Sequence, residues 1–240
     1  MIEVNPRASR TIPYISKVTG VPMVDLASRV MLGEPLKDLG YGTGLYPVPP
    51  CCAIKVPVFS FEKLNDADSI LGPEMKSTGE VLGIGITKAE ALFKGLTAAG
   101  FSLPTARDRS HTGVLLSVED EDFPDTIAMA KRCYDLGIRL FATKDTARAV
   151  SSVGIDVTTV ADPKISDEIV HLMEEGAISY IIYTGAVKDD TVGDYRVLHR
   201  RAMLLGIPCM TSLDTANALA DILGSRFSAE NTKLVDINHM

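Results

Sequence analysis

The chain has 240 residues, of which 46% are hydrophobic and 23% are charged, and its formal net charge is −7. These proportions are close to globular averages and exclude an intrinsically disordered chain, which combines low hydrophobicity with high net charge. Because an acidic chain repels phosphate backbones, we expect no nucleic-acid partner, whereas a small anionic ligand needs only a few local cations or a helix N-terminus.

The cysteines and the absence of long apolar runs help to predict the cellular compartment of the protein. Cys51 and Cys52 are adjacent, which suits neither an ordinary structural disulfide nor the spacing of a zinc site, so we expect reduced thiols. The sequence opens without a charged and apolar leader and has no run of 18 apolar residues. We therefore expect a cytoplasmic protein with no membrane partner.

The first hundred residues predict a mixture of short helices and strands. Hydrophobic periodicity and punctuation by Gly and Pro give five elements, namely a strand at 2–5, helices at 9–19 and 23–32, and strands at 52–60 and 80–86. Pro57 restricts its strand to the edge of a sheet. Thr87 is predicted to cap a helix over 88–99.

A composition change at 100–112, rich in Gly, Pro and charges, predicts a domain boundary. Strands then alternate with helices, with strands at 113–118, 138–142, 156–160, 178–183 and 207–210 and helices at 123–136, 145–152, 166–175, 192–205 and 213–224. This alternation indicates a parallel sheet with helices on both faces. Ligands of such sheets bind beyond the carboxyl ends of the strands.

Glu3 and Asn5 are the first candidates for chemistry. They lie two residues apart in a predicted strand and therefore face the same side. A carboxylate and an amide oxygen suit Mg²⁺, and the guanidinium of Arg7 suits a phosphate or another anion. Spacing alone is equally typical of a strand end with solvated polar residues, so both interpretations stay open at this point.

Two longer segments carry a resemblance. The first segment resembles the end of the second ATP-grasp domain of carbamoyl-phosphate synthase large chains; it covers residues 2–36, IEVNPRASRTIPYISKVTGVPMVDLASRVMLGEPL. The second segment resembles a motif of the same family; it covers residues 71–83, LGPEMKSTGEVLG, and lies as far from the first segment as in that family. The resemblance implies the end of an ATP-grasp domain, as part of a large subunit that makes carbamoyl phosphate from bicarbonate, ammonia derived from glutamine, and two ATP.

The resemblance also implies site residues. In that family the positions matching Glu3 and Asn5 bind the metal of the catalytic ATP, which implies Mg²⁺ or Mn²⁺ here. Arg7 and Arg10 match arginines of the same site and are implied as catalytic contacts to the phosphates or the reacting anion. Positioning and electrostatic stabilisation would dominate such phosphoryl transfer.

The glycine-rich loop, the adenine pocket and the remaining metal carboxylate of an ATP-grasp domain precede this strand in the family. We therefore expect most of the ATP pocket to lie in an upstream part, and we expect the chain alone to make no carbamoyl phosphate. The implied partners are the remainder of the large subunit and a glutaminase small subunit. Arginine and pyrimidine biosynthesis are both compatible with the sequence.

Thr143, Lys144 and Thr146 lie where a predicted strand passes into a helix. Two hydroxyls, a cation and first-turn amides could hold a phosphate, although simple capping by Thr143 or Asp145 explains the pattern equally well. The wider region resembles the methylglyoxal-synthase-like domain that ends these large chains and binds effectors such as uridine or inosine monophosphate. The resemblance implies effector-phosphate contacts at these three residues.

Three departures from the family disfavour nucleotide regulation. A lysine expected early in the first helix falls at about Phe123, and a strand end that usually reads Asn-Thr-Thr reads Tyr183-Thr184-Gly185. Asp145, where glycine is frequent, would repel a phosphate. The identity of a small-molecule effector therefore stays open.

The predicted fold class is α/β, with a truncated ATP-grasp α+β segment at 1–105 and a Rossmann-like, parallel-sheet, methylglyoxal-synthase-like domain at 111–240. Two alternatives remain. A regulatory or assembly module without catalysis would bind a phosphorylated effector and use residues 11–50 to bind a partner. A methylglyoxal synthase would need a catalytic acid that the sequence over 183–187 does not contain.

Overall fold

The computed structural model describes residues 7, 9–41, 44–59, 75–104, 109–163, 165–184, 192–225, 227–228 and 231–233. The internal contacts divide these residues into two compact units. The first unit holds the described residues up to Val58, together with Gly79–Gly100 and 231–233, and the second holds residues 59, 75–78 and 101–228. The strand predicted at 2–5 lies outside the described residues.

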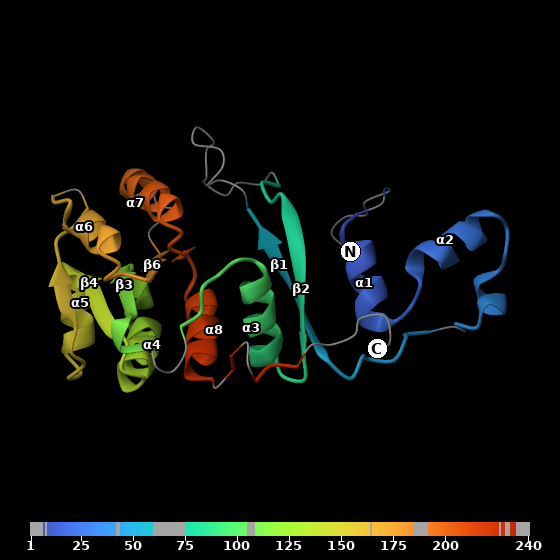
Figure 1. The fold of residues 1–240 in the computed structure, drawn as a ribbon, viewed down its shortest axis with the longest axis horizontal. Helices are drawn as coiled ribbons and strands as arrows, with labels where there is room; N and C mark the ends of the chain where they lie inside the picture. Colours follow the sequence, from blue (N-terminus) through green and yellow to red (C-terminus); the bar gives the residue numbers. More distant parts are fainter. Residues whose placement is uncertain are drawn as a thin grey trace. The chain divides into compact units, whose positions relative to one another are not determined.

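The first unit contains two short helices and a pair of strands covered by a third helix (Figure 1). Its elements are α1 (Thr11–Thr19), α2 (Met23–Met31), the 3-10 helix η1 (Leu36–Leu39), β1 (Cys52–Val58), β2 (Gly79–Gly85) and α3 (Lys88–Ala98). The two strands pair antiparallel, from Cys52 opposite Gly85 to Val58 opposite Gly79. Thr87 caps α3 as predicted, because its Oγ1 accepts a hydrogen bond from the backbone N–H of Glu90 at 3.2 Å.

Glycines let α3 approach the strand pair closely. A Cβ placed on Gly83 would lie 2.0 Å from the carbonyl oxygen of Ala91, and a Cβ on Gly95 would lie 2.8 Å from Cγ2 of Val56. Ala91 is completely buried in this contact. A side chain is excluded at Gly83 by the backbone of α3 and at Gly95 by the side chain of Val56.

The second unit is a doubly wound α/β layer structure. Its strands are β3 (Gly113–Ser117), β4 (Arg139–Thr143), β5 (Thr158–Val160), β6 (Tyr180–Tyr183) and β7 (Cys209–Met210), and its helices are α4 (Phe123–Asp135), α5 (Lys144–Ser151), α6 (Glu168–Glu174), α7 (Val192–Leu204) and α8 (Leu213–Gly224), with short 3-10 helices η3 (Arg109–His111) and η4 (Asp120–Asp122). All strand pairs are parallel, in the order β5-β4-β3-β6-β7.

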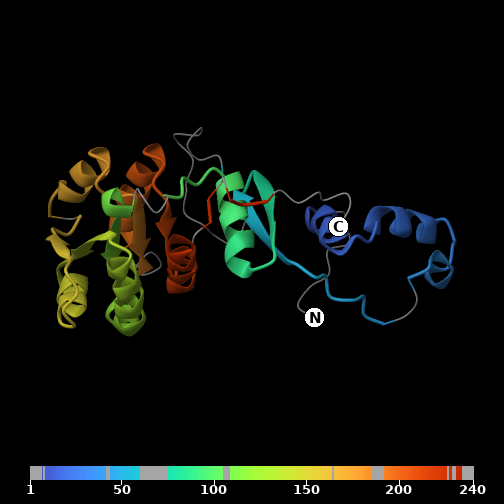
Figure 2. The same cartoon turned by 60° about the horizontal axis from the view of Figure 1, so that its bottom comes forward.

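Helices cover both faces of this sheet (Figures 1 and 2). Val114 and Leu116 of β3 pack with residues of α4, α5 and α8, whereas Leu115 packs with residues of α6 and α7. All three side chains are 1% exposed or less. Because both faces are covered, the central strand is a continuous apolar run, as parallel sheets require. The predicted Rossmann-like α/β architecture is confirmed.

The strand order creates a reversal at the centre of the sheet. From β3 the chain builds β4 and β5 on one side and then crosses to build β6 and β7 on the other. The carboxyl ends of β3 and β6 therefore flank the position at which doubly wound sheets bind ligands. The predicted bounds of the described elements agree with the observed ones to within two residues at each end; β5, for example, begins at Thr158 and not at residue 156.

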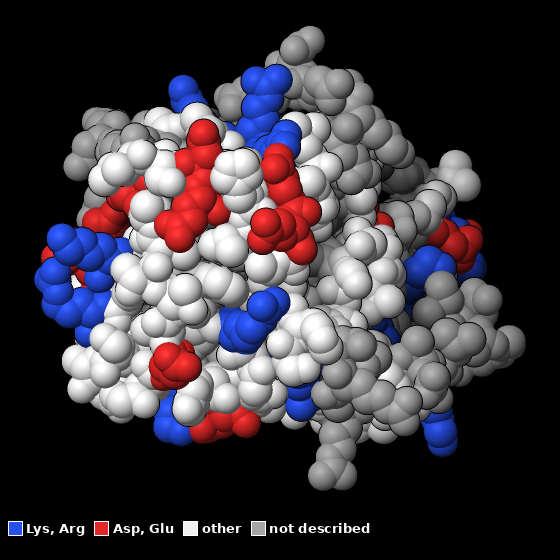
Figure 3. All heavy atoms as spheres, turned by 60° about the vertical axis from the view of Figure 1, so that its left-hand side comes forward, with Lys and Arg blue, Asp and Glu red and all other residues white. Residues whose placement is uncertain are grey.

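No helix among the described residues has the length and the apolar character needed to cross a membrane. On the face of the second unit that Figure 3 shows, Lys and Arg side chains are scattered between Asp and Glu side chains. The described residues of that face therefore form no continuous basic area of the kind that binds nucleic acid.

Substituting Gly113→Ala should destabilise the second unit. A Cβ at this position would lie 1.9 Å from the carbonyl oxygen of Ala177, in the backbone that leads into β6. We expect a loss of about 2–4 kcal/mol in the free energy of unfolding, because backbone must move to relieve the clash. Urea unfolding followed by far-UV circular dichroism measures the loss.

Gly193→Ala is the matched control, because Gly193 lies in α7 and a Cβ there would meet nothing within 4 Å. We expect this variant to keep or gain stability, by about 0.5–1 kcal/mol, since alanine is the better helix former. Equal effects of the two variants would contradict the close contact at Gly113.

Candidate functional site at the carboxyl ends of the strands

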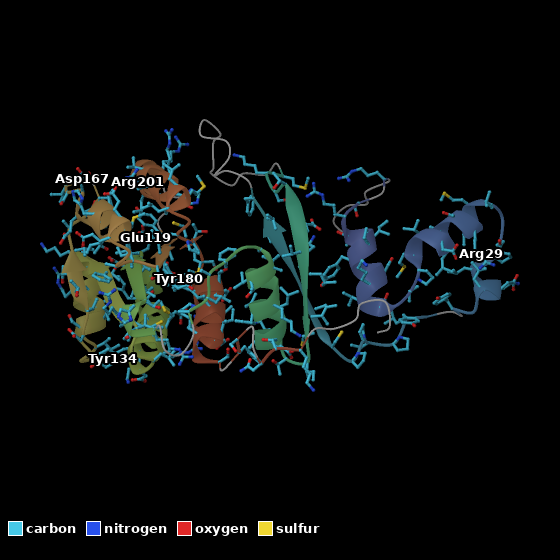
Figure 4. All side chains as sticks on the ribbon, viewed as in Figure 1. Arg29, Glu119, Tyr134, Asp167, Tyr180 and Arg201 are labelled. Carbon is cyan, nitrogen blue, oxygen red and sulfur yellow. The ribbon has the colours of Figure 1, made fainter. Side chains whose placement is uncertain are left out.

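A cavity of about 680 Å³ opens at the carboxyl ends of the strands of the second unit. Its walls are the residues that end or follow four strands, namely Ser117–Asp120 after β3, Thr143–Thr146 after β4, Thr159–Asp162 and Ile165 around the end of β5, and Tyr183 of β6. Figure 4 labels Glu119 in this region and Tyr134 at the opposite end of α4. A cavity of this size suits a small-molecule ligand.

The structure brings the three predicted effector residues together in one wall. Thr143 ends β4 and immediately precedes α5, but its side chain makes no capping hydrogen bond. Its Oγ1 instead donates to Oγ of Ser117 at 3.3 Å and lies 3.5 Å from Oγ1 of Thr146. Thr143 therefore occupies the N-cap position of α5, but its hydroxyl does not make the capping bond. Lys144 supplies the ammonium group of this wall.

Thr146 is the buried member of the three, with 1% of its surface exposed. Its Oγ1 accepts a hydrogen bond from the backbone N–H of Val118 at 3.2 Å and donates to the carbonyl oxygen of Val118 at 3.4 Å. Nearby, the backbone N–H of Glu119 donates to Oγ1 of Thr184 at 3.0 Å. These bonds hold the loop between β3 and α4 against the ends of β4 and β6, and so define the cavity mouth.

Carboxylates outnumber cations in the described lining of the cavity. The lining holds four acidic side chains and one basic side chain, which are Glu119, Asp120, Asp145, Asp162 and Lys144. Oδ1 of Asp145 lies 3.2 Å from Nη1 of Arg148, in an exposed ion pair that solvent screens. The cavity therefore disfavours a multiply charged anion, even though the amides at the start of α5 favour negative charge.

An aromatic stack that sequence reasoning missed lies behind one wall. The ring of Tyr183 is centred 5.4 Å from the ring of Tyr195, which stacks on His199 with centroids 5.0 Å apart. Burial lowers the pKa of His199, because the imidazolium form loses water. Burial also raises the pKa of Tyr195, and Cys209 adds to that rise. The available signal was the spacing of Tyr195 and His199, four residues apart on a predicted helix.

The residues predicted for the ATP site lie in or beside an undescribed part of the chain. Glu3 and Asn5 are outside the described residues. Arg7 and Arg10 are exposed, and Arg10 occupies the N-cap position of α1 without a capping side-chain bond. Within the described part of the chain, no cluster of three or more His, Cys, Asp or Glu side chains could hold a metal ion.

Comparison with known proteins gives two family matches and a close relative. The family described as MGS-like domain matches residues 125–211, and the family described as carbamoyl-phosphate synthase L chain, ATP binding domain, matches residues 1–39. The carbamoyl phosphate synthase large chain of Lachnoclostridium phytofermentans is 45% identical over 240 residues, which is 99% of this chain. Over almost its whole length the chain is thus similar to a carbamoyl-phosphate synthase large chain.

The 240 residues correspond to the C-terminal part of such large chains, and they span 22% of the length of that relative. The resemblance inferred from residues 2–36 and 71–83 is thereby confirmed. The MGS-like match covers the sheet from α4 to β7, and so includes most of the cavity wall. The catalytic acid of a methylglyoxal synthase would be expected within 183–187, and residues 185–187 of this segment lie outside the described residues.

Replacing Thr146 by valine should weaken the loop that borders the cavity. The shape of the side chain is kept, but the N–H and C=O of Val118 lose their partner, which costs about 1–3 kcal/mol of unfolding free energy. Faster hydrogen exchange at the Val118 amide, together with chemical denaturation, measures the effect. Thr159→Val is the control, because Thr159 lines the same cavity but is exposed. It should change stability by less than about 0.5 kcal/mol, and a loss equal to that of Thr146→Val would refute the assignment.

Proposed function

We propose that this chain is the C-terminal portion of a carbamoyl-phosphate synthase large chain, in which the second unit binds a small-molecule effector. The complete enzyme would make carbamoyl phosphate from bicarbonate, ammonia released from glutamine, and two ATP. The observation that carries the regulatory part is the cavity of about 680 Å³ at the carboxyl ends of β3, β4, β5 and β6. Its position at the reversal of strand order is where this architecture binds ligands.

The first unit would contribute part of the synthetic ATP site. In this proposal Glu3 and Asn5 bind Mg²⁺ or Mn²⁺, and Arg7 and Arg10 contact the phosphates or the reacting anion. All four residues fall within the match to the ATP binding domain, and the side chains of Arg7 and Arg10 are exposed. The remaining large chain and a glutaminase small chain would be the partners.

In the second unit, Thr143 and Lys144 would contact the acidic group of the effector. The hydroxyl of Thr143 already lies among the polar groups of the wall, and Lys144 is the cation of the described lining. Thr146 would act by holding the loop, since its hydroxyl is engaged with Val118. Asp145 and its acidic neighbours would keep the affinity for phosphomonoesters low.

The chain by itself should make no carbamoyl phosphate from bicarbonate, ammonia and ATP. The ATP binding domain matches only residues 1–39, which is too short a segment to enclose a nucleotide. The assay measures carbamoyl phosphate by its conversion to citrulline, with the intact relative from Lachnoclostridium phytofermentans as positive control. Synthesis above the level of a heat-inactivated sample would overturn the expectation.

Asp145→Asn should strengthen the binding of uridine monophosphate to the cavity. Removing one negative charge beside Lys144 should lower the dissociation constant by about three- to tenfold at low ionic strength, and by less as salt is added. Lys144→Ala should raise the dissociation constant, both in the unchanged chain and in the Asp145→Asn variant. Calorimetric or NMR titration of the chain measures these changes.

The matched control is Asp135→Asn, at the end of α4, where the carboxylate pairs with Lys131 and lies outside the cavity lining. This variant should bind as the unchanged chain does. Equal affinities for Asp145→Asn and Asp135→Asn would refute the repulsion by Asp145. No binding by any variant, or an unchanged affinity in Lys144→Ala, would refute the phosphate-binding role of Lys144.

A further inference from the structure

Three aromatic side chains, here called the ring cluster, connect α7 to the wall of the cavity in the second unit. The ring of Tyr183 is centred 5.4 Å from that of Tyr195, which stacks on the imidazole of His199 at 5.0 Å. Tyr183 and Tyr195 are buried, and His199 is half-buried. Because Tyr183 also lines the cavity, a change at His199 can reach the cavity through two rings in contact.

The ring cluster is also connected to the loop at the cavity mouth, through Thr184. Thr184 follows Tyr183 in the sequence, and its Oγ1 accepts a hydrogen bond from the backbone N–H of Glu119 at 3.0 Å. Glu119 belongs to the cavity lining. The preceding amide, that of Val118, donates instead to Oγ1 of Thr146 in α5. The loop thus has two anchors, and one of them depends on the position of the end of β6.

His199 is the member of the ring cluster whose charge can change near neutral pH. Burial lowers the pKa of His199 below its usual value of 6.5, because the imidazolium form loses water. Burial raises the pKa of Tyr195, and it raises the pKa of the Cys209 thiol, which acts on Tyr195, to about 12. Both of these groups therefore stay neutral, whereas a charged His199 costs free energy in its place in the stack.

The elements packed around α7 carry several other titratable or charged groups. The described ones are Tyr183 on β6, Cys209 on β7, Glu168, His171, Glu174 and Glu175 on or directly after α6, and Arg196, Arg200 and Arg201 on α7 itself. Glu174 pairs with Arg201, which Figure 4 labels on α7. His199 and Arg201 are two residues apart and so point to different sides of the helix. The net shift of the His199 pKa is downward, so burial outweighs any attraction by these groups.

We propose that the ring cluster makes the cavity wall sensitive to pH, because a neutral His199 keeps Tyr195 and Tyr183 packed and its protonation releases the end of β6. Since folding lowers the pKa of His199, the packed state has its full stability above the usual value of 6.5 and loses stability as the pH falls below it. The N–H of Glu119 then loses its bond to Thr184, and a ligand in the cavity binds less tightly. This last consequence rests on the proposed function.

Amide exchange measured by NMR tests the inference without a ligand. Between about pH 7.5 and about pH 5.5, the protection factor of the Glu119 amide, corrected for the intrinsic pH dependence of exchange, should fall about tenfold. The protection factor of the Val118 amide should change by less than about twofold, because Thr146 and not β6 holds it. The midpoint of the fall should coincide with the titration midpoint of the His199 imidazole.

The decisive variant is His199→Phe, which keeps a ring against Tyr195 but takes up no proton. Its Glu119 protection should be the same at the two pH values. His199→Gln is a second variant that does not titrate, in case the larger ring is not accommodated, and far-UV circular dichroism confirms that both are folded. The matched control is His171→Phe, because the His171 side chain is 72% exposed on α6 and lies outside the ring cluster. It should keep the fall seen in the unchanged chain.

Three exchange results would overturn the inference. They are a fall that persists in both His199 variants, no fall in the unchanged chain, and a fall at Val118 equal to that at Glu119, which would show that acid loosens the whole unit.

Titration with uridine monophosphate separates the inference from the proposed function. The ratio of the dissociation constant at about pH 5.5 to that at about pH 7.5 should be about three- to tenfold larger in the unchanged chain than in His199→Phe, and the titration of the ligand phosphate cancels in this comparison. Equal ratios would overturn the control of binding by the ring cluster. No binding at either pH would overturn the proposed function alone, because the exchange of the Glu119 amide decides whether the wall responds to pH.

Discussion

The hydroxyl of Thr146 holds the main chain of Val118 through both its N–H and its C=O groups. This pair of hydrogen bonds ties the end of β3 to the start of α5, so the loop that walls the cavity has a fixed place. Thr146 is buried, and water cannot compete for these bonds. The positions of Glu119 and Asp120 in the lining, and therefore the charge of the cavity, depend on this attachment.

The shape of the cavity favours an anionic ligand, whereas the charge of its described lining disfavours one. The reversal of strand order and the amides at the start of α5 form the kind of site that holds anions. Asp145 occupies the same first turn as Lys144 and offsets its charge, and the other acidic residues of the lining add to that effect. The described lining therefore favours a ligand with little net negative charge.

The sequence was sufficient for the elements whose signals are local. The apolar runs at 113–118 and 178–183 predicted buried parallel strands, and Thr87 was recognised as a cap because its bond to Glu90 spans only three residues. The position of the cavity followed from the strand-end rule. The partner of the Thr146 hydroxyl could not be predicted, because Val118 lies 28 residues away and meets it only through the packing of two strands. The contact between the tilted rings of Tyr183 and Tyr195 could not be predicted for the same reason.

The two edges of the strand pair in the first unit differ in how readily they would pair with a further strand. Within the described residues β1 and β2 form a sheet of two strands, so each strand has one side that pairs with no other described strand. Pro57 interrupts the donors of β1, whereas β2, with the sequence GEVLGIG, contains no proline and a single charge at Glu80. Unpaired edges of this kind recruit further strands. Of the two described strands, β2 therefore has the edge with which a further strand would pair more readily.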